Sequence, residues 1–130
     1  MRVKNEDLLT VDGVTTQPSM ATSFNLPAIW LGHIDNYAIQ LFFTGTPIGT
    51  FTLQASNDAG NLPNGTGIQA NQVAGITNWT TIADSSVAIS GAGDCMYNVR
   101  NAGYNWVRVV YTATSSTGTL TSARAYVKGI

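Results

Sequence analysis

Apolar and polar residues alternate along much of this chain, and the alternation limits the folds open to it. In residues 37–43 every second side chain is large and apolar, as in a half-buried β-strand. Residues 104–112 are rich in β-branched and aromatic side chains, and 119–128 alternate in the same way. No window combines a 3.6-residue period with a capping residue before it. We therefore predict an all-β fold with almost no helix.

Turn signals divide the alternating runs into seven or eight strands. Pro47 between two glycines separates the run 37–43 from a second run at 51–55, which predicts a hairpin. A Ser-Ser-Thr-Gly turn ending at Gly118 separates 104–112 from 119–128 and predicts a second pair of neighbouring strands. The shorter strand-like segments are 76–82, 86–90 and 95–99.

The number of strands favours two antiparallel sheets packed face to face. A hairpin alone is not stable in water, so two sheets must bury their inner faces against each other. Strands at intervals of about 8–12 residues are typical of such a sandwich. We assign residues 28–130 to this antiparallel β-sandwich domain. A small closed barrel is the rival topology, and the sequence pattern does not separate the two.

Residues 1–27 lack this regularity. A strand-like run at 8–14 is interrupted by the segment 15–19, which contains Pro18, and Pro27 breaks the chain again. We interpret 1–27 as an extended N-terminal arm or an edge strand that is ordered partly by neighbouring molecules. A frayed terminus is the alternative.

Few residues carry a charge, which excludes several classes of function. Charged residues make up 10% of the chain, against about 25% in an average domain, and the net charge is −1. Thr and Ser supply 26 residues and Asn 11, so most of the polarity comes from hydroxyls and amides. This excludes a basic nucleic-acid binder. Because interspersed charges keep a free monomer soluble, we expect protein partners to cover much of this surface.

The sequence gives no sign of export, of a membrane span or of a disulfide. No apolar run of signal-peptide length follows the N-terminus, and none approaches the roughly 20 residues of a membrane helix. Cys95 is the only cysteine, and we expect it to be a small buried apolar residue. We therefore expect a protein made in a reducing cytoplasm.

No arrangement of residues is typical of an enzyme. His33 is the only histidine, and although Asp35 could pair with it, we interpret it as structural. The motifs of zinc proteases, serine hydrolases and phosphate-binding loops are absent from the sequence. We predict no catalytic activity and no cofactor.

The connection that starts at Asn57 and runs to Gly75 is the best candidate for a contact loop. Loops of about 19 residues are uncommon in compact domains and are often functional. Asp58, with oxygens of Asn57 and Asn61, could hold a calcium ion, although a plain Asx-turn explains the same residues. The predicted partner-contact residues are Leu8, Val11, Asn57, Asp58, Asn61, Leu62 and Asn64.

Basic and aromatic residues interleave near the C-terminus. Arg108, Arg124 and Lys128 could share one sheet face with Trp106 and Tyr126, a pattern that can bind single-stranded nucleic acid. Three cations are few for a phosphate track, so we prefer cross-strand stacking of Arg on Trp or Tyr.

Six short segments, taken in order, resemble small structural proteins of tailed bacteriophages. The resemblance covers residues 39–128 and implies a virion protein, either a head decoration or cement protein or a minor head or tail protein, with a sandwich of jelly-roll or discoidin type. Some of the segments also resemble discoidin-like domains, which often bind glycans, but the basic ligand residues of such domains are not identifiable here. The segments are Ile39–Leu41 with Thr44-Gly45, Gly49–Asp58, Asn78–Thr80, Tyr104–Tyr111, Ser116–Leu120 and Lys128-Gly129.

The function implied by this resemblance is binding without chemistry. A decoration protein clamps neighbouring capsid subunits, so the expected partners are the major capsid protein or other virion proteins. We expect a dimer, a trimer or many copies per particle, located in the virion after assembly in the host bacterial cytoplasm. Segments 1–27 and 57–75 would make the contacts. The alternative is a carbohydrate-binding module of a phage tail fibre or adhesin, with exposed aromatics among Trp30, Trp79 and Trp106.

Overall fold

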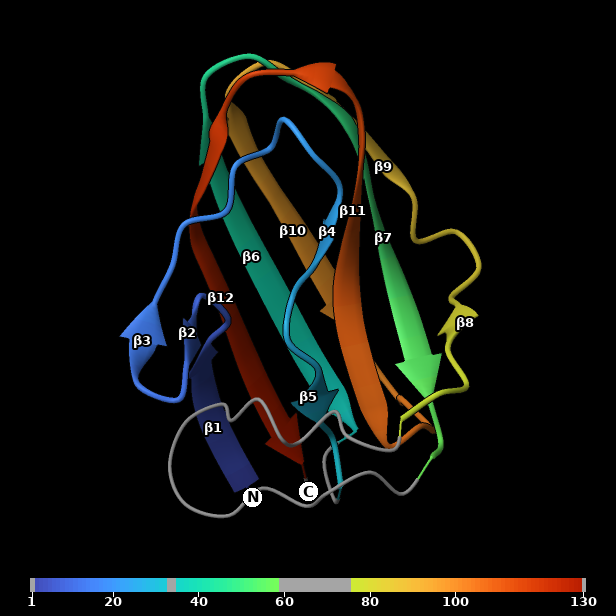
Figure 1. The fold of residues 1–130 in the computed structure, drawn as a ribbon. Helices are drawn as coiled ribbons and strands as arrows, with labels where there is room; N and C mark the ends of the chain where they lie inside the picture. The colour runs from blue at the N-terminus through green and yellow to red at the C-terminus, as the bar shows by residue number, and fades with distance from the viewer. Residues whose placement is uncertain (1, 33–34, 59–75, 130) are drawn as a thin grey trace.

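Two antiparallel sheets pack face to face in the computed structural model, which describes residues 2–32, 35–58 and 76–129 (Figure 1). The described residues contain strands, turns and bends but no helix. The prediction of an all-β antiparallel sandwich is confirmed, and because the sheets are separate the barrel alternative is wrong.

The first sheet has four strands. Its order is β1 (Arg2–Asp7), β12 (Thr119–Gly129), β6 (Asn36–Thr44) and β10 (Gly93–Val99).

The second sheet is built around a long central pair, β11 (Trp106–Ser116) and β7 (Pro47–Ser56). The short strands β4 (Phe24–Asn25) and β5 (Ile29–Trp30) pair with the free side of β11. Likewise β8 (Thr80–Thr81) and β9 (Val87–Ser90) pair with the free side of β7. A separate small hairpin joins β2 (Thr10–Val11) to β3 (Val14–Thr15).

The strand order is that of a jelly roll. β4 and β5 follow one another along β11, and β8 and β9 follow one another along β7, so each pair is one interrupted strand. Counted this way, and without the β2–β3 hairpin, eight strands form sheets in the order 1-8-3-6 and 2-7-4-5. Jelly rolls have eight strands in two such sheets. The described part of the chain therefore contains twelve strands, against the seven or eight predicted, because two of the eight jelly-roll strands are interrupted and the β2–β3 hairpin is additional.

The two predicted strand pairs are wrong. β6 pairs with β12 and β10, whereas β7 lies in the other sheet, and β11 and β12 are separated in the same way. The chain therefore turns a corner from one sheet to the other after β6 and again after β11, at the top of Figure 1. Alternation predicts which face of a strand is buried but not which strand lies beside it.

The two corners stack on each other. Thr44 lies opposite Thr119 in the first sheet, and Pro47 lies opposite Ser116 in the second. The hydroxyls of Thr46 and Thr117 are 2.8 Å apart. Gly118 has a φ of +129°, and a Cβ there would lie 2.6 Å from the Thr44 carbonyl oxygen. Glycine is therefore required where the corners cross.

The core lies between the sheets and includes residues from the N-terminal segment. β1 is an edge strand of the first sheet, and Leu8, Met20 and Leu26 are buried beside the sheets' inner faces. Cys95 is also buried, as expected, and burial raises the pKa of its thiol. The main inward side chains are Tyr37, Ile39, Leu41, Phe51, Leu53, Val107, Val109, Tyr111, Ala123, Ala125 and Val127.

Candidate functional site

A second apolar cluster lies on the outer face of the second sheet. Along β11, Val107 and Val109 point into the core, so Trp106 points the other way. Trp106 is nevertheless fully buried, packed with Ala28 and Ile76. Trp30 and Trp79 are half-buried and pack against the same group, which we call the tryptophan cluster. We define it as Ala28, Trp30, Ile76, Trp79 and Trp106.

Arg108 covers one side of the tryptophan cluster. Its guanidinium carbon lies 4.1 Å from the centre of the Trp79 ring. Nε and Nη2 of Arg108 donate to Oε1 of Gln54, at 2.9 and 2.7 Å, which fixes the plane of the guanidinium. Desolvation lowers the pKa of Arg108 from its ordinary value. Arg108 therefore stacks on an aromatic ring, as predicted, but the ring is Trp79, outside the strands, and not Trp106 or Tyr126.

The predicted basic and aromatic face is divided between the two sheets. Arg108 and Trp106 belong to β11, whereas Arg124, Tyr126 and Lys128 belong to β12 in the other sheet. These five residues therefore do not form one phosphate track, which supports the stacking interpretation.

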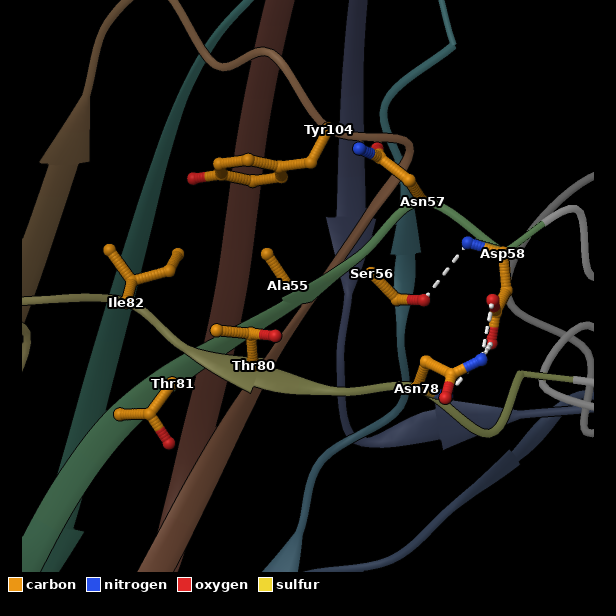
Figure 2. Close-up of a pocket in the computed structure, with 9 residues that line it drawn as sticks. All are labelled: Ala55, Ser56, Asn57, Asp58, Asn78, Thr80, Thr81, Ile82 and Tyr104. Carbon is orange, nitrogen blue, oxygen red and sulfur yellow. Dashed lines mark hydrogen bonds between the residues drawn. The ribbon is translucent and has the colours of Figure 1, made fainter.

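A pocket opens beside the tryptophan cluster, where β7 ends and β8 begins (Figure 2). Its volume is about 450 Å³, and Figure 2 shows the Tyr104 ring across it from Thr80 and Thr81. The wall combines one aromatic ring with amide, hydroxyl and carboxylate groups. The lining residues are Ala55, Ser56, Asn57, Asp58, Asn78, Thr80, Thr81, Ile82 and Tyr104.

Asp58 holds one end of this pocket together. Its Oδ2 accepts hydrogen bonds from the backbone N–H groups of Thr77 and Asn78, both at 2.8 Å, and Oδ1 accepts one from Nδ2 of Asn78 at 3.1 Å. The Asp58 N–H donates to Oγ of Ser56 at 3.0 Å (Figure 2). The bonds from Asn78 and then Thr77 lower the pKa of Asp58, because they favour the ionised form. Asp58 therefore joins the chain on either side of residues 59–75.

Asn57 and Tyr104 are fixed from the opposite side. The Asn57 Oδ1 accepts from the backbone N–H of Asn105 at 3.0 Å, and the Asn57 carbonyl accepts from Nδ2 of Asn105 at 3.2 Å. The Tyr104 hydroxyl lies 2.6 Å from that of Tyr37. Burial, followed by this contact, raises the pKa of Tyr37. The pocket wall is thus held in place before any ligand arrives.

Of the three residues weighed as calcium ligands, the two that the structure describes, Asn57 and Asp58, do not form an open oxygen cage. The Asp58 oxygens and Oδ1 of Asn57 accept hydrogen bonds from N–H groups, which would have to move before a cation could bind. Asn61 lies outside the described residues. Over residues 2–32, 35–58 and 76–129, no three His, Cys, Asp or Glu side chains are grouped as a metal site. The contacts of Asp58 are those of the Asx-turn alternative, extended to Thr77 and Asn78.

The predicted partner-contact residues are scattered. Leu8 is 1% exposed and belongs to the core, so its side chain offers almost no surface. Val11 is half-buried in the β2–β3 hairpin, and Asn57 and Asp58 line the pocket. Asn61, Leu62 and Asn64 lie outside the described residues, as does His33.

No local signal placed Asn78 and Tyr104 in a site, although both lie in segments that carry the phage resemblance. They reach the pocket where Asp58 and Asn57 bind Asn78 and Asn105 across long stretches of chain. An aspartate directly after a strand and before a long connection is the one local signal that pointed here.

In the part of the chain that the structure describes, no helix has the length and apolar character needed to span a membrane.

Comparison with known proteins identifies a shared fold. No family model matches the sequence, and no curated protein matches it. Twenty-five chains of solved structures match. One is the SPBc2 prophage-derived protein YomS, with a TM-score of 0.50 and 11% sequence identity over 97% of this chain and 92% of that chain. At this identity the match shows that the two chains share a fold along nearly their whole length.

Proposed function

We propose that this chain is a structural virion protein of a tailed bacteriophage, and specifically a decoration or cement protein that binds neighbouring capsid subunits and stabilises the head. Two observations support the association with phages: the ordered motifs in residues 39–128, and the fold shared with a prophage-derived protein. The jelly roll is also a common fold of viral capsid domains.

The outer face of the first sheet is the observation that carries the binding role. Phe42, Met96 and Tyr126 point away from the core and are 41%, 55% and 46% exposed. A shallow hollow of about 380 Å³ on this face is lined by Met96, Tyr126, Gln40, Arg124, Asn5 and Ala38. Met96 and Tyr126 line the same hollow, and exposed apolar side chains that gather in this way are typical of protein interaction sites. We call this surface the bare face.

The proposed partner is the major capsid protein. The bare face also carries charges, because Arg124 with its ion-pair partner Asp7, and Asp94 and Lys128, lie on the same side of the sheet as Phe42 and Tyr126. An interface on it therefore combines buried apolar area with ion pairs, and binding should weaken in part as salt rises, because salt screens exposed charges and leaves apolar burial intact. The proposal includes no catalytic step. The only titratable side chains lining the described pocket are Asp58 and Tyr104.

The test is to mix the purified chain with capsids of its own phage that lack decoration protein. We expect saturable, stoichiometric binding and capsids that open at a higher temperature. Tyr126→Lys should weaken binding at least tenfold, which corresponds to about 1.4 kcal/mol. Ile48→Lys is the matched control, because Ile48 is 43% exposed but belongs to the second sheet. Absence of binding by the unmodified chain contradicts the proposal, as does equal weakening by both variants.

A carbohydrate-binding module is the second candidate function, and the pocket is the observation in its favour. Sugars stack their C–H faces on aromatic rings and bond their hydroxyls to Asn, Asp and Thr side chains, and Tyr104, Asn57, Asn78 and Thr80 meet here. The tryptophans are less suitable, because Trp106 is 0% exposed and Trp79 lies under Arg108.

Titration with host polysaccharides decides this second candidate. We expect binding that Tyr104→Ala abolishes and Tyr126→Ala does not change, because Tyr126 lies on the bare face. Failure of a panel of host-surface glycans to bind, or loss of binding in both variants, contradicts it.

A further inference from the structure

The four edges of the sandwich differ in how well they are protected. An edge strand presents unpaired backbone N–H and C=O groups, and native proteins protect edges with charges, prolines, interruptions or short strands. In β1, four of the six residues are charged. The β4–β5 edge is divided at Pro27 into two strands of two residues each. The β8–β9 edge is interrupted over residues 82–86.

β10 has only one of these protections, a single charged residue. Its seven residues, GDCMYNV, form one continuous strand without proline, lysine or arginine, and Asp94 is its only charged residue. It pairs with β6 along one side, and within the described residues no strand pairs with its other side. Met96, at its centre, is 55% exposed, more than Phe42 or Tyr126 on the same sheet. A strand of this kind is suited to adding another strand.

We infer that β10 pairs with β10 of a second copy of this chain, in antiparallel orientation and centred on Met96. The two four-stranded sheets would then form one continuous sheet of eight strands across a twofold axis. Such an interface uses the same surface on both copies and closes on itself, so the assembly stops at a dimer.

The sequence of β10 is what selects a second copy as the partner. When two copies of β10 pair in antiparallel orientation with Met96 opposite Met96, Asp94 of one copy lies opposite Asn98 of the other. The carboxylate then faces an amide that can donate a hydrogen bond to it. Met96 faces Met96, and the inward Cys95 faces the inward Tyr97. No like charges meet, and opposed like charges are what destabilises strand pairs. Of the possible registers, only this one pairs all seven residues of β10.

Pairing of β10 with β1 of another copy is the alternative arrangement. It would leave one β1 and one β10 edge open at the ends of every assembly, so copies would add without limit. It would also place β10, whose one charged residue is Asp94, against the four charged residues of β1, so that at least three of those four have no oppositely charged partner in β10.

This inference depends on the strand edges and not on the proposed function. If the chain is a monomer and still binds capsids, the inferred dimer is wrong and the proposed function stands. If the chain is a dimer but does not bind capsids, the proposed function is wrong and the inferred dimer stands.

The first experiment measures the mass of the full chain in solution by sedimentation or light scattering, from about 1 to 100 µM, since small interfaces bind weakly. We expect the mass of two chains at the upper concentrations. Met96→Lys should give monomers, because it brings two cations face to face. The control Ile48→Lys, at a similarly exposed site of the second sheet, should leave the dimer intact. A monomer at every concentration, or an assembly larger than a dimer, overturns the inference.

The second experiment tests the register by disulfide crosslinking in a Cys95→Ala background. Directly opposed residues of antiparallel strands have Cα atoms about 4.5–5.5 Å apart, within reach of a disulfide. Met96→Cys should therefore crosslink two chains. Asn98→Cys should not, because the two copies of residue 98 would be offset by four residues, or about 14 Å. Efficient crosslinking through residue 98, or a dimer that does not crosslink through residue 96, overturns this pairing.

Discussion

Trp106 and Tyr126 both point away from the core, one from each sheet, and they meet different environments. Trp106 is fully buried because segments of the same chain, around Ala28 and between Ile76 and Trp79, fold over it. Tyr126 is 46% exposed on the bare face. The chain therefore covers the outer face of its second sheet around Trp106 and leaves the outer face of its first sheet open around Tyr126. The tryptophan cluster therefore stabilises the monomer, whereas the bare face is available to a partner.

Removing the Trp106 side chain should have the largest effect on stability. Trp106→Ala leaves a large cavity in the tryptophan cluster, and such changes in a packed site cost about 3–5 kcal/mol. Tyr126→Ala, the matched change on the bare face, should cost less than about 1 kcal/mol. Urea denaturation followed by circular dichroism measures both. If both variants lost the same free energy of unfolding, the two outer faces would contribute equally to the stability of the monomer.

Removing the cation that covers the cluster should have a smaller effect. Arg108→Met keeps an aliphatic side chain over Trp79 but removes the guanidinium and its two bonds to Gln54, so we expect a loss of about 1 kcal/mol. Arg124→Met on the first sheet should change stability by less than about 0.5 kcal/mol, because its 3.8 Å ion pair with Asp7 is exposed. Denaturation with tryptophan fluorescence distinguishes the two, and a larger loss for Arg124→Met would reverse the comparison.

The hydrogen bonds that Asp58 accepts from Thr77 and Asn78 should make the stability of the protein sensitive to acid. The folded-state pKa of Asp58 is lowered, so its contribution is complete above its unfolded pKa of about 3.9 and is lost as the pH falls through the folded value. Asp58→Asn should therefore be less stable than the unmodified chain at pH 7, with the difference shrinking below pH 4. Thermal melts across this range test it. If the difference in melting temperature between the two proteins were the same at every pH, the ionised Asp58 side chain would contribute nothing to stability.

The smallest effect is expected at Phe42. Phe42→Thr should change the free energy of unfolding by less than about 0.5 kcal/mol, because the side chain is 41% exposed on a strand and threonine suits strands. The melting temperature measures this. A marked loss would mean that the bare face is already packed within the monomer.

The alternation in the sequence was sufficient to locate the long strands and their buried faces. β6, β7, β10 and β12 contain segments that were predicted as strands from their alternation, and β11 overlaps another, beginning two residues later than predicted. Alternation was not sufficient to assign the strands to sheets. Gly45 and Gly118 allow a tight turn, and such a turn can join two strands of one hairpin or two strands of different sheets. The assignment depends on pairings far apart in sequence, such as that of Ser116 with Pro47.

The covering of the second sheet could not be predicted from local patterns. Residues 76–82 have the composition of a strand, but only Thr80–Thr81 pairs with β7, because Ile76 and Trp79 pack over Trp106 instead. Trp106 itself occupies an outward position, and nothing adjacent in the sequence marks it as buried. Asp58 was identified, but its partners, Thr77 and Asn78, are 19 and 20 residues away.

The position of β12 has a consequence for synthesis. β12 follows every other described strand in the chain, yet it lies in the interior of the first sheet, between β1 and β6. Until β12 has been synthesised, nothing joins β1 to β6, because β12 lies between them in the first sheet. The apolar face of that sheet is then incomplete and exposed. Contacts between such distant segments slow folding. The first sheet can therefore be completed only after β12 has left the ribosome, and until then the apolar side of β6 that β12 will flank stays exposed.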